Sequence, residues 1–182
     1  MARKIQTKIL ENGNSFSKEL EERVLTMKII KKKKLENFKS FFDRFGPNIL
    51  ILDTETTGFD PNEGHRLIEI GCVELHDYVP TGRVFHKYIN PERDVPAEAV
   101  AVHGLTAAFL SDKPIFSEVV DEFLSFIGPD QLVIHNAEFD LKFLNAELKK
   151  TGFATLKNPA LDTVMVARRM FPGQPASLDA LC

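Results

Sequence analysis

The sequence predicts an α/β fold, with a mixed sheet of five strands flanked by helices. Three extended apolar segments come first, and strands and helices alternate after them. This order is typical of a sandwich in which helices pack on a sheet with both parallel and antiparallel neighbours. The chain has 182 residues, of which 43% are hydrophobic, so it can bury one core of ordinary size.

The first three strands are predicted from apolar runs. Residues 49–52 (ILIL) form a continuous run, which indicates a strand buried on both faces. Residues 68–76 and 83–91 are predicted as two further strands, because both carry apolar residues typical of strands. The VPTG segment at 79–82 between them indicates a turn.

Two later helices are well marked. Apolar side chains recur every three or four positions from Phe116 to Ile127, with Pro114 suited to the first turn and Gly128 at the end. Asn136 is a suitable N-cap for a second helix over 137–150. Strands at 131–135 and 159–162, and a helix in VMVARRM at 164–170, complete the predicted elements.

Residues 1–46 differ from the rest and are predicted to be a basic, partly helical extension of a domain at 47–182. The extension holds 12 Lys and Arg against 6 Asp and Glu, whereas the domain holds 11 against 20. This segment would pack on the domain, form a solvated leader, or bind DNA or a partner. Its apolar residues at helical spacing are Leu35, Phe38, Phe41, Phe42 and Phe45.

Cysteine content and hydropathy exclude several classes of protein. The only cysteines are Cys72 and Cys182, too few for a disulfide scaffold or a zinc site. No apolar run approaches the roughly 20 residues of a membrane span. We therefore expect a soluble, cytoplasmic protein. Because the domain is acidic, any contact with nucleic acid would require a local source of positive charge, such as bound divalent cations.

Asp53 and Glu55 form the clearest candidate site. Both follow the first apolar strand, and alternation along a strand points them to one face with Cα atoms about 6.5 Å apart. Two such carboxylates repel each other unless a divalent cation lies between them, and their oxygen ligands suit Mg²⁺ or Mn²⁺. Asp140 follows the fourth strand, where ligands bind in open α/β sheets, and would complete the site.

Four segments together resemble the DnaQ-like exonucleases, the histidine-type branch of the DEDD superfamily: DTETTGFD at 53–60, VHGLT at 102–106, IHNAEFD at 134–140, and residues 161–182. The resemblance covers residues 48–182. It implies a ribonuclease-H-like fold and removal of 3′-terminal nucleotides from DNA by two divalent cations, Mg²⁺ or Mn²⁺. It also implies proofreading during replication, with a frayed or single-stranded 3′ end and a replicative polymerase subunit as partners.

The resemblance also implies roles for individual residues. Asp53 would bind both metal ions, Glu55 would bind one ion and the terminal nucleotide, and Asp140 would hold the second ion through water. Glu98 and His103 match the family's contacts to the terminal nucleotide. The remaining candidates, Thr56 and Asn136, would support the site.

The family's third motif, a His-x-x-x-x-Asp on a helix beyond the SLDALC segment, has no counterpart here, because no histidine follows His135 in these 182 residues. The resemblance therefore implies an incomplete domain that lacks the last helix of the fold, the general-base His and the fourth metal ligand. We expect the chain as written to be weakly active or inactive. Two alternatives remain: a non-catalytic module that binds metal or nucleic-acid ends, and an exonuclease of the same superfamily that acts on RNA ends.

Overall fold

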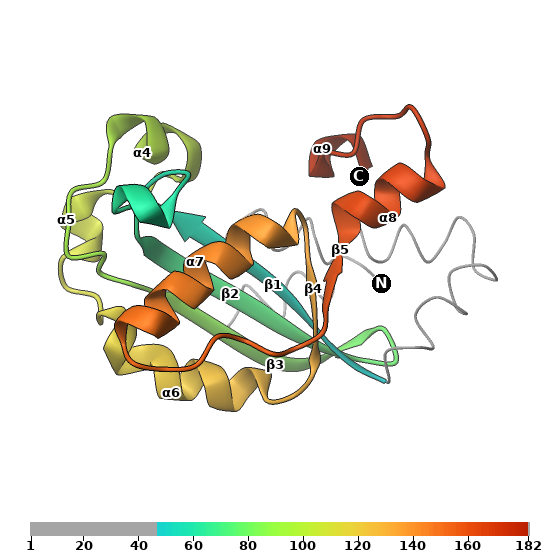
Figure 1. Ribbon diagram of the computed structural model, residues 1–182, viewed down its shortest axis with the longest axis horizontal. Coiled ribbons are helices and arrows are strands. Elements are labelled where there is room, and N and C mark those ends of the chain that lie inside the picture. The colour runs from blue at the N-terminus through green and yellow to red at the C-terminus, as the bar shows by residue number, and fades with distance from the viewer. Residues whose placement is uncertain (1–46, 182) are drawn as a thin grey trace.

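The computed structural model describes residues 47–181, so the predicted extension at 1–46 lies outside the described residues. Five strands form one sheet in the order β3-β2-β1-β4-β5 (Figure 1). β1 pairs antiparallel with β2 and parallel with β4, so the sheet is mixed, as predicted. The strands are β1 Asn48–Thr56, β2 Leu67–His76, β3 Val79–Tyr88, β4 Gln131–Ile134 and β5 Ala160–Asp162.

The helices predicted from periodicity are confirmed, and shorter ones are added. α6 spans Phe116–Ile127, α7 spans Ala137–Lys150 and α8 spans Thr163–Met170. Four short helical segments were not predicted, because one or two turns show too little periodicity. They are η1 Pro61–Glu63, α4 Ala97–His103, α5 Ala107–Leu110 and α9 Leu178–Leu181.

β1 lies at the centre of the sheet, which explains its continuous apolar run. Leu50 and Leu52 belong to the larger core cluster on the face covered by α6 and α7 (Figure 1). Ile49 and Ile51 belong to a second cluster on the opposite face, together with Val166 of α8. Because alternate side chains enter opposite faces, both sets must be apolar, and all four residues are at most 1% exposed.

The predicted turn at 79–82 is wrong, because these residues lie within β3. The hairpin instead turns at Asp77 and Tyr78, whose φ angles are 48° and 64°. Two consecutive residues with positive φ match the twist of a two-residue hairpin. Pro80 and Gly82 are tolerated because β3 is an edge strand, where one side of the backbone needs no partner strand.

Candidate functional site

The carboxyl end of β1 carries the predicted acidic pair. Asp53 is 4% exposed and Glu55 is half-buried. Alternation from Ile49 and Ile51 places both carboxylates on the face opposite α7. The ladder with β2 shifts register between Glu55 and Thr56, so the regular strand ends directly after the acidic pair.

Asp140 is brought to the same strand end from a distant part of the chain. The Thr54 hydroxyl donates to Asp140 Oδ1 at 2.8 Å, a buried bond between residues 86 positions apart. Thr54 points to the α7 face because it alternates with Asp53 and Glu55. Asp140 lies in the first turn of α7 and is only 2% exposed. The hydrogen bond therefore fixes the start of α7 to the middle of the DTET segment.

The three predicted ligands are not assembled into one cluster. Among residues 47–181, no group of three or more His, Cys, Asp or Glu side chains has the arrangement of a metal site. The donor chemistry still suits a hard divalent cation, because Asp53, Glu55 and Asp140 offer only carboxylate oxygens. Asp53 and Glu55 share a face, whereas Asp140 is directed to Thr54 between them.

The loop after β1 is held by close packing around Gly58. A Cβ at Gly58 would overlap the imidazole of His65, so any other residue there would have to displace that ring. His65 Nδ1 lies 3.1 Å from Thr57 Oγ1, which also accepts from the Arg66 main chain at 2.9 Å. Thr56 Oγ1 donates to the carbonyl of Gly58 at 2.6 Å. Thr56 thus supports the loop through its hydroxyl.

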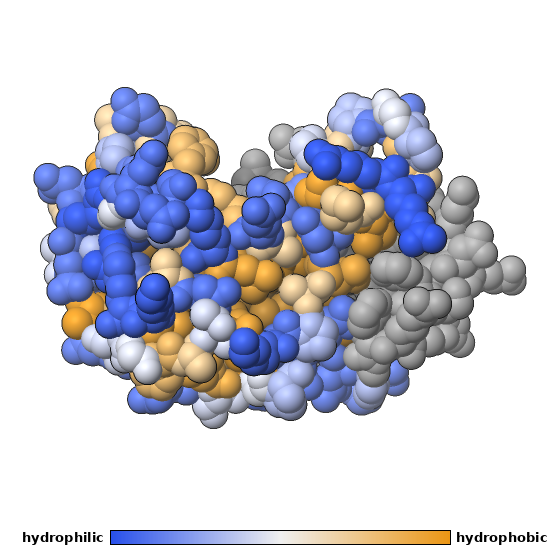
Figure 2. Space-filling model, in the orientation of Figure 1, coloured by the Kyte–Doolittle hydropathy of each residue, from blue (hydrophilic) through white to orange (hydrophobic). Residues whose placement is uncertain are grey.

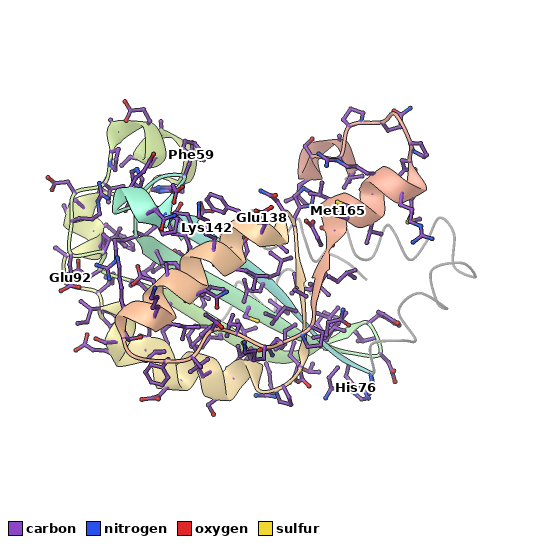
Figure 3. All side chains as sticks on the ribbon, viewed as in Figure 1. Phe59, His76, Glu92, Glu138, Lys142 and Met165 are labelled. Atoms are coloured by element: carbon purple, nitrogen blue, oxygen red, sulfur yellow. The ribbon has the colours of Figure 1, made fainter. Side chains whose placement is uncertain are left out.

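The loop is also tied to α7 at its surface. Lys142 of α7 forms an ion pair with Asp60 at 2.8 Å, and it holds the pKa of Asp60 below its usual value. Phe59, next to Asp60, is 87% exposed. Figure 3 labels Phe59, Lys142 and Glu138 beside the notch that the space-filling view shows between α4 and α8 (Figure 2). An exposed aromatic ring at this place was not predicted from the sequence.

His103 is the last residue of α4 and is partly buried. Its Nδ1 accepts a hydrogen bond from the main chain of Leu105 at 3.0 Å, which leaves the proton of the neutral ring on Nε2. Burial lowers the pKa of His103, and the charge of Glu69 and the main chain of Thr56 oppose this only in part. His103 therefore lies near the end of β1. Glu98 is exposed in the first turn of α4.

Asn136 occupies the N-cap position of α7 but does not cap it with its side chain. Its φ of 65° is left-handed, and its main-chain N–H donates to Asp162 Oδ1 at 3.1 Å. The same oxygen of Asp162 accepts from Val164 at 2.8 Å and caps α8. Asn136 thus joins the start of α7 to Asp162 through its backbone, and the expected side-chain cap is wrong.

Two buried side-chain pairs near the site were missed in the sequence. Arg66 binds both oxygens of Glu147 on α7, at 2.6 and 2.9 Å, and this pairing raises the pKa of Arg66. His86 Nε2 lies 2.6 Å from Glu69 Oε1. The available signal for the second pair was a glutamate inside the apolar run IEIGCVEL of β2, where a charged side chain is rare unless it is paired.

Solved structures define the class of fold to which this sheet and its helices belong. Exonuclease X in complex with 5′ overhanging duplex DNA is 28% identical, with a TM-score of 0.59 over 73% of this chain and 70% of that one. E. coli exonuclease I in complex with a dT13 oligonucleotide has a TM-score of 0.66 at 17% identity, over 74% of this chain and 34% of that one. The architecture is the ribonuclease-H-like fold of DEDD exonucleases, as predicted.

Residues 50–182 match the exonuclease family known as RNase T, and the chain belongs to this family. The DNA polymerase III subunit epsilon of Rickettsia felis is 54% identical over 137 residues, which cover 73% of this chain and 60% of that protein. The same subunit of Salmonella typhimurium is 47% identical over 146 residues, covering 73% and 58%. The chain thus spans about 60% of the length of these relatives.

Proteins of this family generally depend on divalent metal ions. None of the helices within residues 47–181 combines the length and the hydrophobicity of a membrane span.

Proposed function

We propose that this chain is a metal-dependent 3′–5′ exonuclease that removes 3′-terminal nucleotides from DNA during proofreading in the cytoplasm. The observation that carries the proposal is the buried bond between Thr54 and Asp140, which joins two predicted motifs 86 residues apart at one strand end. The relatives named DNA polymerase III subunit epsilon support a replicative polymerase as the partner.

Three carboxylates would hold the metal ions. Asp53 and Glu55 would bind two Mg²⁺ or Mn²⁺ ions directly, and Asp140 would act through water, which fits its bond to Thr54. The ions would supply positive charge at the phosphate and make water a better nucleophile. In an acidic domain, that charge would also attract the DNA backbone.

The terminal nucleotide would be bound by the groups that surround this strand end. His103, which is partly exposed, would contact the terminal nucleotide, and Glu55 and Glu98 can accept from the sugar hydroxyl. Phe59 offers an exposed ring on which a base can stack, a contact that tolerates any base. A mismatched end unpairs more easily than a matched one, so such a site would favour mismatched ends.

Mn²⁺ binding and nucleotide release test this function together. We expect calorimetry to show Mn²⁺ uptake by the full chain that Asp53→Asn abolishes. The control Asp94→Asn, at an exposed position, should leave uptake unchanged. Release of 3′ mononucleotides should occur from single-stranded DNA in Mn²⁺ and be lost in Asp53→Asn.

Each of the other results favours a different reading of the chain. Mn²⁺ uptake without nucleotide release would favour a non-catalytic binding module. Faster release from RNA than from DNA of the same sequence would favour an RNA-end exonuclease. Unchanged Mn²⁺ uptake in Asp53→Asn would remove the proposed site.

A further inference from the structure

A buried carboxylate, Glu69, lies beside the predicted ligands and has no place in the function proposed above. In the ladders of β2, Glu69 faces Glu55 of β1 on one side and Tyr88 of β3 on the other. Residues that face each other across a ladder share one face of the sheet. Gly71, two positions along β2, faces both Asp53 and His86. One polar patch of the sheet therefore contains the predicted ligands Asp53 and Glu55 together with Glu69, His86 and Tyr88.

Glu69 and His86 form a buried pair within this patch. His86 Nε2 donates to Glu69 Oε1 at 2.6 Å, and the two side chains are only 5% and 6% exposed. Taking two ionisable groups out of water is unfavourable, and an apolar pair could often fill the same space at least as stably. Because Glu69 faces Glu55, the position of the pair indicates a functional role at the candidate site.

A continuous path of contacts joins this pair to His103. The ring of His86 packs edge-on against Tyr88 with centroids 4.8 Å apart, and Tyr88 packs in the same way on Phe109 of α5 at 5.0 Å. Thr106 is the N-cap of α5, and its hydroxyl accepts from the main chain of Phe109. Immediately before it, Leu105 donates to Nδ1 of His103. The edge strand β3 thus supports the loop that fixes the ring of His103.

The other nitrogen of His103 is directed into the same region. Its Nε2 is a buried atom, and the ring is subject both to the charge of Glu69 and to the main chain of Thr56. A ring held at Nδ1 and enclosed at Nε2 has one orientation. That orientation depends on where β3 and α5 hold the loop.

We propose that Glu69 and His86 are positioning residues: their buried hydrogen bond, through Tyr88 and Phe109, holds His103 in the orientation that contacts the terminal nucleotide. This inference rests on the proposed function, and it adds residues that touch neither the metal ions nor the DNA. Because the pair acts through a hydrogen bond and not through its charge, glutamine at position 69 can still accept from His86.

Binding of DNA ends by the full chain tests this proposal without depending on turnover. The probes are a short single-stranded DNA with a 3′-hydroxyl and the same strand with a 3′-phosphate, both in Ca²⁺, with affinity read from fluorescence anisotropy. The unaltered chain should prefer the 3′-hydroxyl, and His103→Ala should lose that preference. Glu69→Leu should reduce the preference by about three- to tenfold, as expected for one lost hydrogen bond. Glu69→Gln should retain it.

A matched control lies on the same strand. Glu74 is also a buried carboxylate of β2 paired with β3, where it binds Thr81 at 2.7 Å and Arg83, but it lies on the opposite face. Glu74→Leu should lower the unfolding midpoint and leave the preference for 3′-hydroxyl ends unchanged. If Glu69→Leu does not fold, Phe109→Ala interrupts the path at a residue that is 43% exposed, and it should also reduce the preference.

The outcomes separate the inference from the function on which it rests. If His103→Ala loses the preference while Glu69→Leu or Phe109→Ala keeps it, the positioning network is wrong and the function stands. If Glu69→Gln loses as much as Glu69→Leu, the charge is required and the proposed hydrogen-bond mechanism is overturned. If the unaltered chain has no preference, the proposed contact of His103 with the terminal nucleotide fails, and the inference fails with it.

Discussion

At the scale of single residues, small features around the DTET segment decide the geometry of the site. Thr54, Gly58 and Leu105 contribute a hydroxyl, a missing side chain and a main-chain N–H. The first two lie in the motif that predicted the site. The bond from Thr54 to Asp140 could not be assigned from the sequence, because a side-chain bond across 86 residues leaves no local pattern.

Gly58→Ala should destabilise the protein by about 1–3 kcal/mol, the usual range for overpacking. The new methyl group would displace His65 and break its contact with Thr57. Urea unfolding measures the effect. In a His65→Ala background the same change should cost less, because the space is then open. If Gly58→Ala costs the same stability in both backgrounds, overlap with the ring of His65 is not the cause of the destabilisation.

The stability of the protein should depend on the protonation of His103. Burial lowers the pKa of His103 from its ordinary value of 6.5, so the unfolded chain takes up its proton first as the pH falls. The free energy of unfolding should therefore fall as the pH drops below about 6.5, and His103 should have no further effect at higher pH. Urea unfolding at pH 7.5 and 5.5 should show a smaller difference for His103→Gln than for the unaltered chain. An equal difference would contradict this assignment.

At the scale of secondary-structure elements, the sequence predicted the long elements better than the short ones. α6 and α7 were predicted from apolar periodicity, and β1 from an apolar run that fits its central position. α4 and α5, which carry His103 and Phe109, are too short to show a period. The turn at Asp77 and Tyr78 was missed because neither residue is a glycine, although both have positive φ.

α7 should depend on the ion pair between Arg66 and Glu147. The side chain of Glu147 is 3% exposed and that of Arg66 is 18% exposed. Arg66→Met would leave a buried carboxylate without its partner and should cost about 3–5 kcal/mol. Arg66→Met combined with Glu147→Leu should recover much of that loss. Guanidinium unfolding of the two single variants and the double variant gives the coupling energy, and additive losses would contradict a direct coupling.

At the scale of the whole molecule, charge is divided unevenly along the chain. Residues 47–182 contain 11 Lys and Arg against 20 Asp and Glu, whereas residues 1–46 contain 12 against 6. The sequence predicted the fold class and the order of the motifs, and it also predicted that the net negative charge of the domain would repel DNA. An acidic domain can hold a polyanion only if cations reduce the repulsion.

Single-stranded DNA binding should consequently depend on divalent cations. We expect EDTA to lower the affinity of the chain by about tenfold or more at moderate salt, because the ions supply the positive charge at the site. A variant with glutamine in place of the four lysines at 31–34 distinguishes DNA binding by the acidic domain from DNA binding by the extension. If that variant binds equally well in Mn²⁺ and in EDTA, the acidic domain does not recruit DNA through metal ions.

The bond between Thr54 and Asp140 has a consequence for synthesis of the protein. β1 needs both β2 and β4 as neighbours, and Asp140 follows β4, so the two halves of the site cannot meet until most of the domain has been translated. A nascent chain still on the ribosome therefore presents its first acidic pair without the third carboxylate. Under the proposed function, a half-made protein would therefore lack a complete metal site, because the order of the strands along the chain delays its assembly.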